Sequence, residues 1–251
     1  MVKLGSALLL FIVVLLSGVI DFAQGGPPLL TDDPGTPGDG NWEINIGFTI
    51  EKLLQETLYE APILDINYGL GERIQLKYEV SWVFLDEEGA CTKSGLGNSE
   101  IGIKYRFLDE EQHGISTSVY PQFSFNNPTS SDERGLVDSG TELLLPVQIA
   151  RRIGPVELGL ELGYAFVEYE EDEWIYGLAA AWPLAERFEL VGEVYGVSTR
   201  DFEEDVLVFN LGGVLQVNEK VNLLFSAGRS FREPSPTEPE LLGYLGFQFN
   251  F

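Results

Sequence analysis

The stretch Glu240-Leu-Leu-Gly-Tyr-Leu-Gly-Phe-Gln-Phe-Asn-Phe251 carries the pattern that decides the fold of this chain. Apolar and polar residues alternate along it, which is the period-two pattern of a β-strand with one apolar face. That face carries Leu241, Leu245, Phe247, Phe249 and Phe251. The last strand of a soluble β-sandwich and the last strand of a membrane β-barrel both fit this alternation. A face so rich in aromatic residues favours the barrel.

The first 25 residues have the features of a cleaved secretory signal peptide. Lys3 supplies a positive charge, residues 7–16 are apolar, and Ala23-Gln-Gly25 offers small residues at a cleavage site. The apolar run is short of the ~20 residues that a transmembrane helix needs. The only cysteine, Cys91, excludes an internal disulfide. We therefore expect an exported protein.

Composition narrows the class of protein further. The chain has 40 acidic and 15 basic residues, a net charge of −25, and a hydrophobic fraction of 44%. So acidic a chain is a poor partner for nucleic acid, and so apolar a chain is not a disordered acidic tail. A chain with many acidic residues and a normal share of apolar residues needs one surface in an apolar environment and one surface in contact with water. A barrel in lipid with a polar lumen provides both.

Alternation recurs along the chain and predicts an all-β, antiparallel up-and-down transmembrane barrel. In the third strand, Leu76, Tyr78 and Val80 face one way, and Lys77 and Glu79 face the other. The predicted strands run about 9–14 residues, which suits a tilted membrane strand of ~9–11 residues better than a sandwich strand of ~5–6. The twelve predicted strands cover 42–51, 58–68, 74–84, 99–107, 115–125, 141–150, 156–169, 174–182, 188–197, 205–217, 221–230 and 240–251.

The connections fit the same architecture. Five predicted periplasmic turns are short, whereas the outer connections 85–98, 126–140 and 231–239 are longer, as in known outer-membrane barrels. Residues 26–41 have no periodicity, and we expect an irregular segment at the barrel mouth before the barrel itself, 42–251. Pro62, Pro121 and Pro146 should interrupt three strands, because each proline removes a ladder hydrogen bond.

The residues expected to point into the lumen form the candidate functional site. They are Glu43, Asp65, Lys77, Glu79, Lys104, Arg106, Tyr120, Glu142, Glu157, Glu161, Glu193 and Tyr195. One interpretation is a structural network of ion pairs and water that fills a narrow barrel. The other is a solute path, in which the excess of carboxylates disfavours anions. Tyr120 and Tyr195 are the candidates for contact with an aromatic solute.

The sequence contains few residues suited to catalysis. The only histidine, His113, lies in a predicted turn beside acidic residues, so a membrane-embedded hydrolase is the disfavoured alternative. We expect no catalytic residue, no cofactor and no metal site. The acidic clusters at 86–88, 170–173 and 203–205 are expected to be solvated, with weak divalent-cation binding as an alternative.

Several segments resemble one family of outer-membrane barrels, labelled for the phenol meta-cleavage pathway. They are Leu30-Thr-Asp-Asp-Pro-Gly-Thr36, residues 40–47, residues 95–107 and residues 142–149. Asn98 departs from the aspartate expected there. The resemblance implies a barrel in the bacterial outer membrane that transports small solutes, with aromatic compounds as candidates. The final strand also looks like the segment, ending here in Phe251, that the barrel-assembly machinery reads.

These observations lead to one expectation and one alternative. The expectation is a non-enzymatic outer-membrane channel or transporter whose partners are membrane lipid, the assembly machinery and a small solute. The alternative is an outer-membrane barrel with a plugged lumen and a structural or surface-binding role. A β-barrel of twelve strands has a narrow bore, so side chains and loops could close it.

Overall fold

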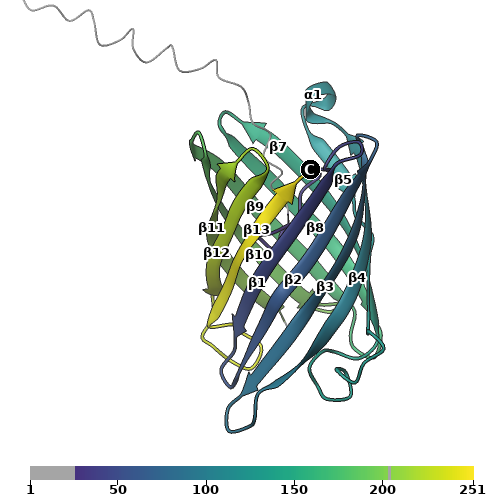
Figure 1. The fold of residues 1–251 in the computed structure, drawn as a ribbon, viewed down its shortest axis with the longest axis vertical. Helices are drawn as coiled ribbons and strands as arrows, with labels where there is room; N and C mark the ends of the chain where they lie inside the picture. The colour runs from purple at the N-terminus through teal and green to yellow at the C-terminus, as the bar shows by residue number, and fades with distance from the viewer. Residues whose placement is uncertain (1–25, 203–204) are drawn as a thin grey trace, which may run out of the picture.

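The computed structural model describes residues 26–202 and 205–251, and they form a closed antiparallel β-barrel (Figure 1). The predicted signal peptide lies outside the described residues. The strands are β1 (Trp42–Lys52), β2 (Glu56–Leu70), β3 (Ile74–Glu87), β4 (Lys93–Leu108), β5 (Ser116–Val119), β6 (Gln122–Phe125), β7 (Thr141–Ile153), β8 (Val156–Val167), β9 (Glu173–Ala185), β10 (Phe188–Thr199), β11 (Asp205–Asn218), β12 (Val221–Ser230) and β13 (Leu241–Asn250); one short helix is α1 (Glu110–His113).

The sheet closes on itself, and the chain runs from one end of the barrel to the other twelve times. Except for β5 and β6, which do not pair with each other, each strand pairs with its sequence neighbours; β13 also pairs with β1, so that Phe249 lies opposite Ile44. Strands β5 and β6 are two halves of one crossing, and each pairs with both β4 and β7. The prediction of a twelve-strand antiparallel barrel is therefore confirmed.

The three prolines affect their strands differently. Pro121 separates β5 from β6, which is the interruption expected of a missing N–H. Pro62 lies at a register shift between β2 and β3. Glu60 pairs with Val83 and the next paired residue of β2, Ile63, pairs with Ser81, so the pairing skips Pro62. Pro146 stays inside β7, and its carbonyl oxygen accepts a hydrogen bond from the N–H of Tyr120 at 3.1 Å.

The two ends of the barrel differ in their connections. At the end where Trp42 and Phe251 lie, here called the terminal end, the turns are short; that end also carries α1, drawn at the top of Figure 1. At the opposite loop end, two of the connections are residues 126–140 and 231–240. The expected division between short turns and longer loops is confirmed for these connections.

One expected loop is wrong. The sequence predicts a connection over 85–98, but β3 continues to Glu87 and β4 begins at Lys93. The extra pairs include Trp82 with Leu96 and Phe84 with Ser94. The glycines at 95 and 97 suggest a turn, yet in the structure they are strand residues that let the 126–140 loop and Ser81 approach closely.

The outward face of the barrel is apolar and the inward face is polar. Ile103, Leu162 and Leu211 lie in mid-wall positions with more than half of their surface exposed, and aromatic residues accompany them. Facing inward, Lys104 and Glu161 are 3% and 2% exposed. This is the arrangement of a barrel that meets lipid outside and polar groups inside. The two faces of the third predicted strand are as expected, because Leu76 and Tyr78 are exposed and Gln75 is buried.

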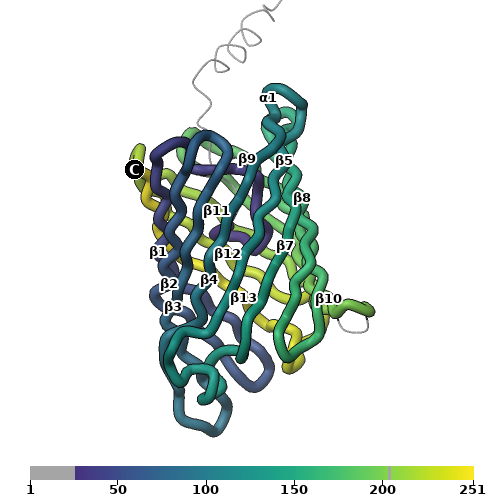
Figure 2. The backbone as a smooth tube through the Cα atoms, turned by 90° about the vertical axis from the view of Figure 1, so that its right-hand side faces the viewer, coloured from purple at the N-terminus to yellow at the C-terminus, as the bar shows by residue number. Residues whose placement is uncertain are grey.

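Residues 26–41 form an irregular segment inside the ring of strands, seen as the purple trace within the barrel in Figure 2. We call it the plug segment. It leads into β1 at the terminal end, where the N–H groups of Gly40 and Gly69 donate to the carbonyl oxygens of Gly69 and Asn41. Among the described residues, no helix is long and apolar enough to cross a membrane.

Candidate functional site

Two buried carboxylates hold the backbone of the plug segment. Glu193 on β10 accepts hydrogen bonds from the N–H groups of Leu30 at 2.9 Å and Thr31 at 2.7 Å. Glu161 on β8 accepts one from the N–H of Asp32 at 2.9 Å. Three backbone N–H groups that would otherwise be buried without a partner are satisfied in this way. The plug segment is therefore tied to the barrel wall by acids that belong to the predicted lumen.

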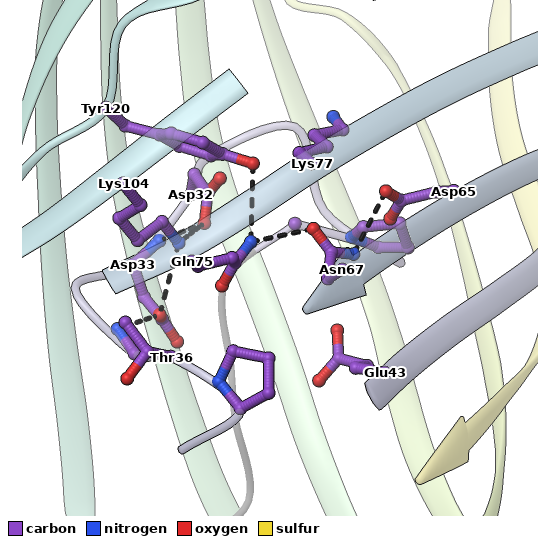
Figure 3. Close-up of a pocket in the computed structure, with 14 residues that line it drawn as sticks. Asp32, Asp33, Thr36, Glu43, Asp65, Asn67, Gln75, Lys77, Lys104 and Tyr120 are labelled. Atoms are coloured by element: carbon purple, nitrogen blue, oxygen red, sulfur yellow. Dashed lines mark hydrogen bonds and ion pairs between the residues drawn. The ribbon is translucent and has the colours of Figure 1, made fainter. Parts of the chain in front are cut away.

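A buried ion pair holds the side of the plug segment that faces β4. The Lys104 ammonium lies 2.8 Å from Oδ1 of Asp32 and 4.0 Å from Oδ1 of Asp33. The same ammonium lies 4.6 Å from the centre of the Tyr120 ring, a cation–π contact (Figure 3). Removing one partner of such a buried pair leaves an uncompensated charge, which is strongly destabilising.

The wall makes room for the plug segment at two glycines. A Cβ atom on Gly177 would overlap Oγ1 of Thr31, and one on Gly69 would overlap the carbonyl oxygen of Gly38. Any larger residue at either position would push the plug segment away. These are places where the absence of a side chain lets two backbones approach.

Little space is left beside the plug segment. One cavity of about 30 Å³ lies between Asp33, Glu43, Lys77 and Tyr120, and a second of about 20 Å³ lies against β8 and β9. Each has room for little more than a water molecule. A chain of side-chain hydrogen bonds lines the first cavity, from Gln75 through Asn67 to Asp65, at 2.7 and 3.0 Å (Figure 3). Neither cavity can hold an organic solute while the plug segment is in place.

A larger space lies toward the loop end of the lumen. It is a cavity of about 460 Å³, which we call the vestibule. Strands β1 to β4, the turn after β1, Ser124 and residues 135–138 line it. Between the vestibule and the plug segment, the Lys77 ammonium lies 3.0 Å from Glu79 and 2.8 Å from Glu100. This ion-pair cluster forms the floor of the vestibule.

The structure brings some of the predicted lumen residues together and separates others. Eight of them surround the plug segment or its two cavities: Glu43, Asp65, Lys77, Lys104, Tyr120, Glu157, Glu161 and Glu193. Glu79 lines the vestibule, and Glu142 stands at the start of β7 toward the loop end. Toward the terminal end, Arg106 pairs with Asp109 at 2.9 Å and Glu157 with Arg152 at 2.8 Å. Tyr195 is half-buried on β10.

Sequence reasoning misses part of the site. It places Asp32 and Asp33 only in an irregular segment, although they lie in the stretch that carries the family resemblance. Gln148 is fully buried and donates to Glu161 at 2.8 Å while accepting from Ser118 at 2.7 Å. Alternation in the strand around Gln148 is imperfect. Its inward position, two residues from Pro146, is the signal that could have identified it.

The fold and lumen define the class of protein: a transmembrane β-barrel of the outer-membrane type, with an apolar outer belt and a polar interior. Within that class, the chain belongs to the family described as "Putative MetA-pathway of phenol degradation", whose model matches residues 31–248. The match begins inside the plug segment and runs almost to the end of β13. The resemblance inferred from short segments is confirmed.

Solved structures share the barrel at low sequence identity. The COG4313 outer membrane channel from Pseudomonas putida F1 superposes with a TM-score of 0.71 and 13% identity, over 87% of this chain and 99% of that chain. The NanC porin gives 0.59 and 9%, over 83% and 98%. The CymD monoaromatic hydrocarbon channel gives 0.51 and 9%, over 85% and 89%. At these identities the similarity establishes the fold. No curated protein matches the sequence.

Proposed function

We propose that this protein is a channel for small solutes in the bacterial outer membrane and that the plug segment is its gate. The observation that carries the proposal is the polar lumen: buried Glu, Lys, Asn and Gln side chains line it along most strands. A barrel that only had to be stable would gain more from apolar packing, because buried charges are costly even when they are paired. A lumen of charged and polar groups instead suits a path for water-soluble or amphipathic molecules.

The plug segment must move before an organic solute can pass, since the two cavities found beside it are water-sized. Hydrogen bonds and ion pairs make up its polar contacts with the wall, and it follows directly on the predicted cleavage site. Displacing it exchanges buried polar contacts for contacts with water and takes Leu29 out of an apolar cluster with Ala181, Val191, Val214 and Leu224. Such exchanges shift a two-state equilibrium by a few kcal/mol, which is the range of ordinary gating.

The family description and the name of the CymD channel support aromatic molecules among the solutes. Tyr120 and Tyr195 remain our candidates for stacking on such a ring. Tyr120 is 1% exposed beneath Lys104, so it can contact a solute only after the plug segment leaves. Glu157, Glu161 and Glu193, once uncovered, would favour cations over anions.

Location and assembly form part of the same proposal. The apolar belt supports residence among outer-membrane lipids, and residues 1–25 would direct export and then be removed. The final strand β13 closes the barrel against β1 and ends beside Phe251. We propose that this strand is recognised by the barrel-assembly machinery. No residue of the lumen is assigned a catalytic role.

Planar-bilayer recordings of the purified protein test the proposal. We expect discrete current steps, with cations more permeant than anions at 0.1 M salt and a weaker preference at 1 M, where the screening length falls from ~10 Å to ~3 Å. Liposomes containing the protein should also admit phenol and small sugars faster than empty liposomes. Silent bilayers together with impermeable liposomes would favour the alternative, a plugged barrel with a structural or surface-binding role.

A further inference from the structure

The vestibule combines an apolar surface with an acidic one. Val83, Leu85 and Leu136 form a buried apolar cluster, with Leu58 and Val137 packed against it. Leu136 comes from the 126–140 loop, which folds inward to complete this wall. All five residues line the cavity. A solute in the vestibule would therefore find an apolar surface on which to place a hydrocarbon or a ring.

Acidic residues share this cavity with the apolar ones, and none of its lining residues is a cation. These acids include Glu51, Glu56, Glu60 and Asp138. Glu60 accepts hydrogen bonds only from hydroxyl groups, those of Ser81 at 2.6 Å and of Thr49 at 3.0 Å, in the described structure. On the floor, Glu79 and Glu100 are already paired with Lys77. The cavity therefore keeps an excess of negative charge at its sides.

Size and spacing exclude other occupants. A volume of about 460 Å³ lies in the range of small-molecule pockets, ~300–1,000 Å³. Nowhere in residues 26–202 and 205–251 do three or more His, Cys, Asp or Glu gather closely enough to hold a metal ion. Anions would be repelled, and a neutral ring would leave the carboxylates without a partner.

We propose that the vestibule binds small organic cations with an apolar body, the class of aryl- and alkylammonium ions. The ammonium group would lie among Glu51, Glu56 and Glu60, and the apolar body against Val83, Leu85 and Leu136. This inference rests on the proposed function, because the vestibule lies in the loop-end part of the same lumen. It makes these cations the preferred solutes of the channel.

Calorimetry on the full-length mature protein in detergent tests the proposal with four matched probes. They are 2-phenylethylammonium, 2-phenylethanol, phenylacetate and ethylammonium. At 0.1 M salt we expect saturable binding of 2-phenylethylammonium, at least about tenfold tighter than any of the other three, because only it satisfies both surfaces. Binding should weaken at 1 M salt. Equal affinity for the alcohol and the ammonium probe would overturn the proposal.

Variants locate the binding. The pair Glu51→Gln and Glu56→Gln changes two acids of the proposed site whose carboxylates hold no other part of the described structure in place, so it should leave the fold intact and weaken binding of 2-phenylethylammonium about fivefold or more. The matched pair Glu171→Gln and Glu186→Gln, in exposed connections, should leave it unchanged. Leu136→Ser should bring the affinity for 2-phenylethylammonium close to that for ethylammonium.

The outcomes separate this inference from the channel proposal. Binding without conductance would support the cation site and end the channel proposal. Conductance without binding would overturn the cation site and leave the channel proposal standing. Calcium that displaces 2-phenylethylammonium at equal concentration would identify a metal site and overturn the inference.

Discussion

Replacing Glu193 with glutamine should open the gate. The carboxylate accepts two hydrogen bonds from the plug segment, at Leu30 and Thr31, and a third from Asn210 at 2.6 Å. Glutamine keeps one acceptor oxygen and presents an NH₂ group where the second oxygen stood. One backbone N–H of the plug segment would then face a donor.

The size of the effect follows from these contacts. A hydrogen bond to a charged group contributes ~1.5–3 kcal/mol and a neutral one ~0.5–1.5 kcal/mol. The variant loses one of these hydrogen bonds to a charged group and weakens the other. This cost exceeds the gain from no longer burying a charge, so we expect the closed state to be destabilised by about 2 kcal/mol. That changes the ratio of open to closed barrel roughly 30-fold. A barrel open about 1% of the time would become open about a quarter of the time.

Single-channel recordings measure this change directly. Glu142→Gln is the matched control, because Glu142 also faces the lumen but contacts no residue of the plug segment in the described structure. Both variants should keep the heat-modifiable gel migration of a folded barrel. An open fraction for Glu193→Gln within about twofold of the Glu142→Gln value would refute the reasoning, since Glu193 would then contribute nothing to closure.

Three further predictions concern the wall. Leu162→Arg, at an exposed mid-wall position, should lower the free energy of unfolding in vesicles by ~2–4 kcal/mol, whereas Glu142→Arg in the acidic lumen should cost under about 1 kcal/mol; equal costs would mean that the faces are misassigned. Deleting Phe251 should reduce outer-membrane levels on cell fractionation, and unchanged levels would argue against recognition of the last strand. Gly69→Ala should displace the plug segment and raise the open fraction, whereas Gly159→Ala, whose Cβ meets nothing nearer than 3.8 Å, should not; identical recordings would contradict the close approach at Gly69.

The fold was largely predictable because a barrel wall imposes period two on every strand. An inward residue meets polar neighbours and an outward residue meets lipid. Lys77, which points inward, is therefore charged, and Tyr78, which points outward, is aromatic. Eleven of the twelve crossings are continuous strands, and even the interrupted one breaks at a proline that the sequence displays.

The closed gate was not predictable in the same way. The contacts of Glu193 with Leu30 and Thr31 join residues more than 160 positions apart, and no local pattern encodes such a pairing. The extended hairpin of β3 and β4 was missed for a related reason. Gly95 and Gly97 act through the loop and side chain that approach them, whereas a sequence alone presents glycines as turn residues.

A reversible lock on the plug segment tests the central claim most directly. In a Cys91→Ser background, Thr31→Cys and Gly177→Cys would place two thiols across the seat of the plug segment, where a Cβ added to Gly177 would lie 3.0 Å from Cβ of Thr31. A shift of ~0.5–1 Å in this irregular segment reaches disulfide geometry. Bilayer current through the oxidised protein should cease and should return when a reductant is added. Current that persists in the oxidised protein would show that the plug segment is not the gate, and the absence of current in both states would show that the lumen is not a path.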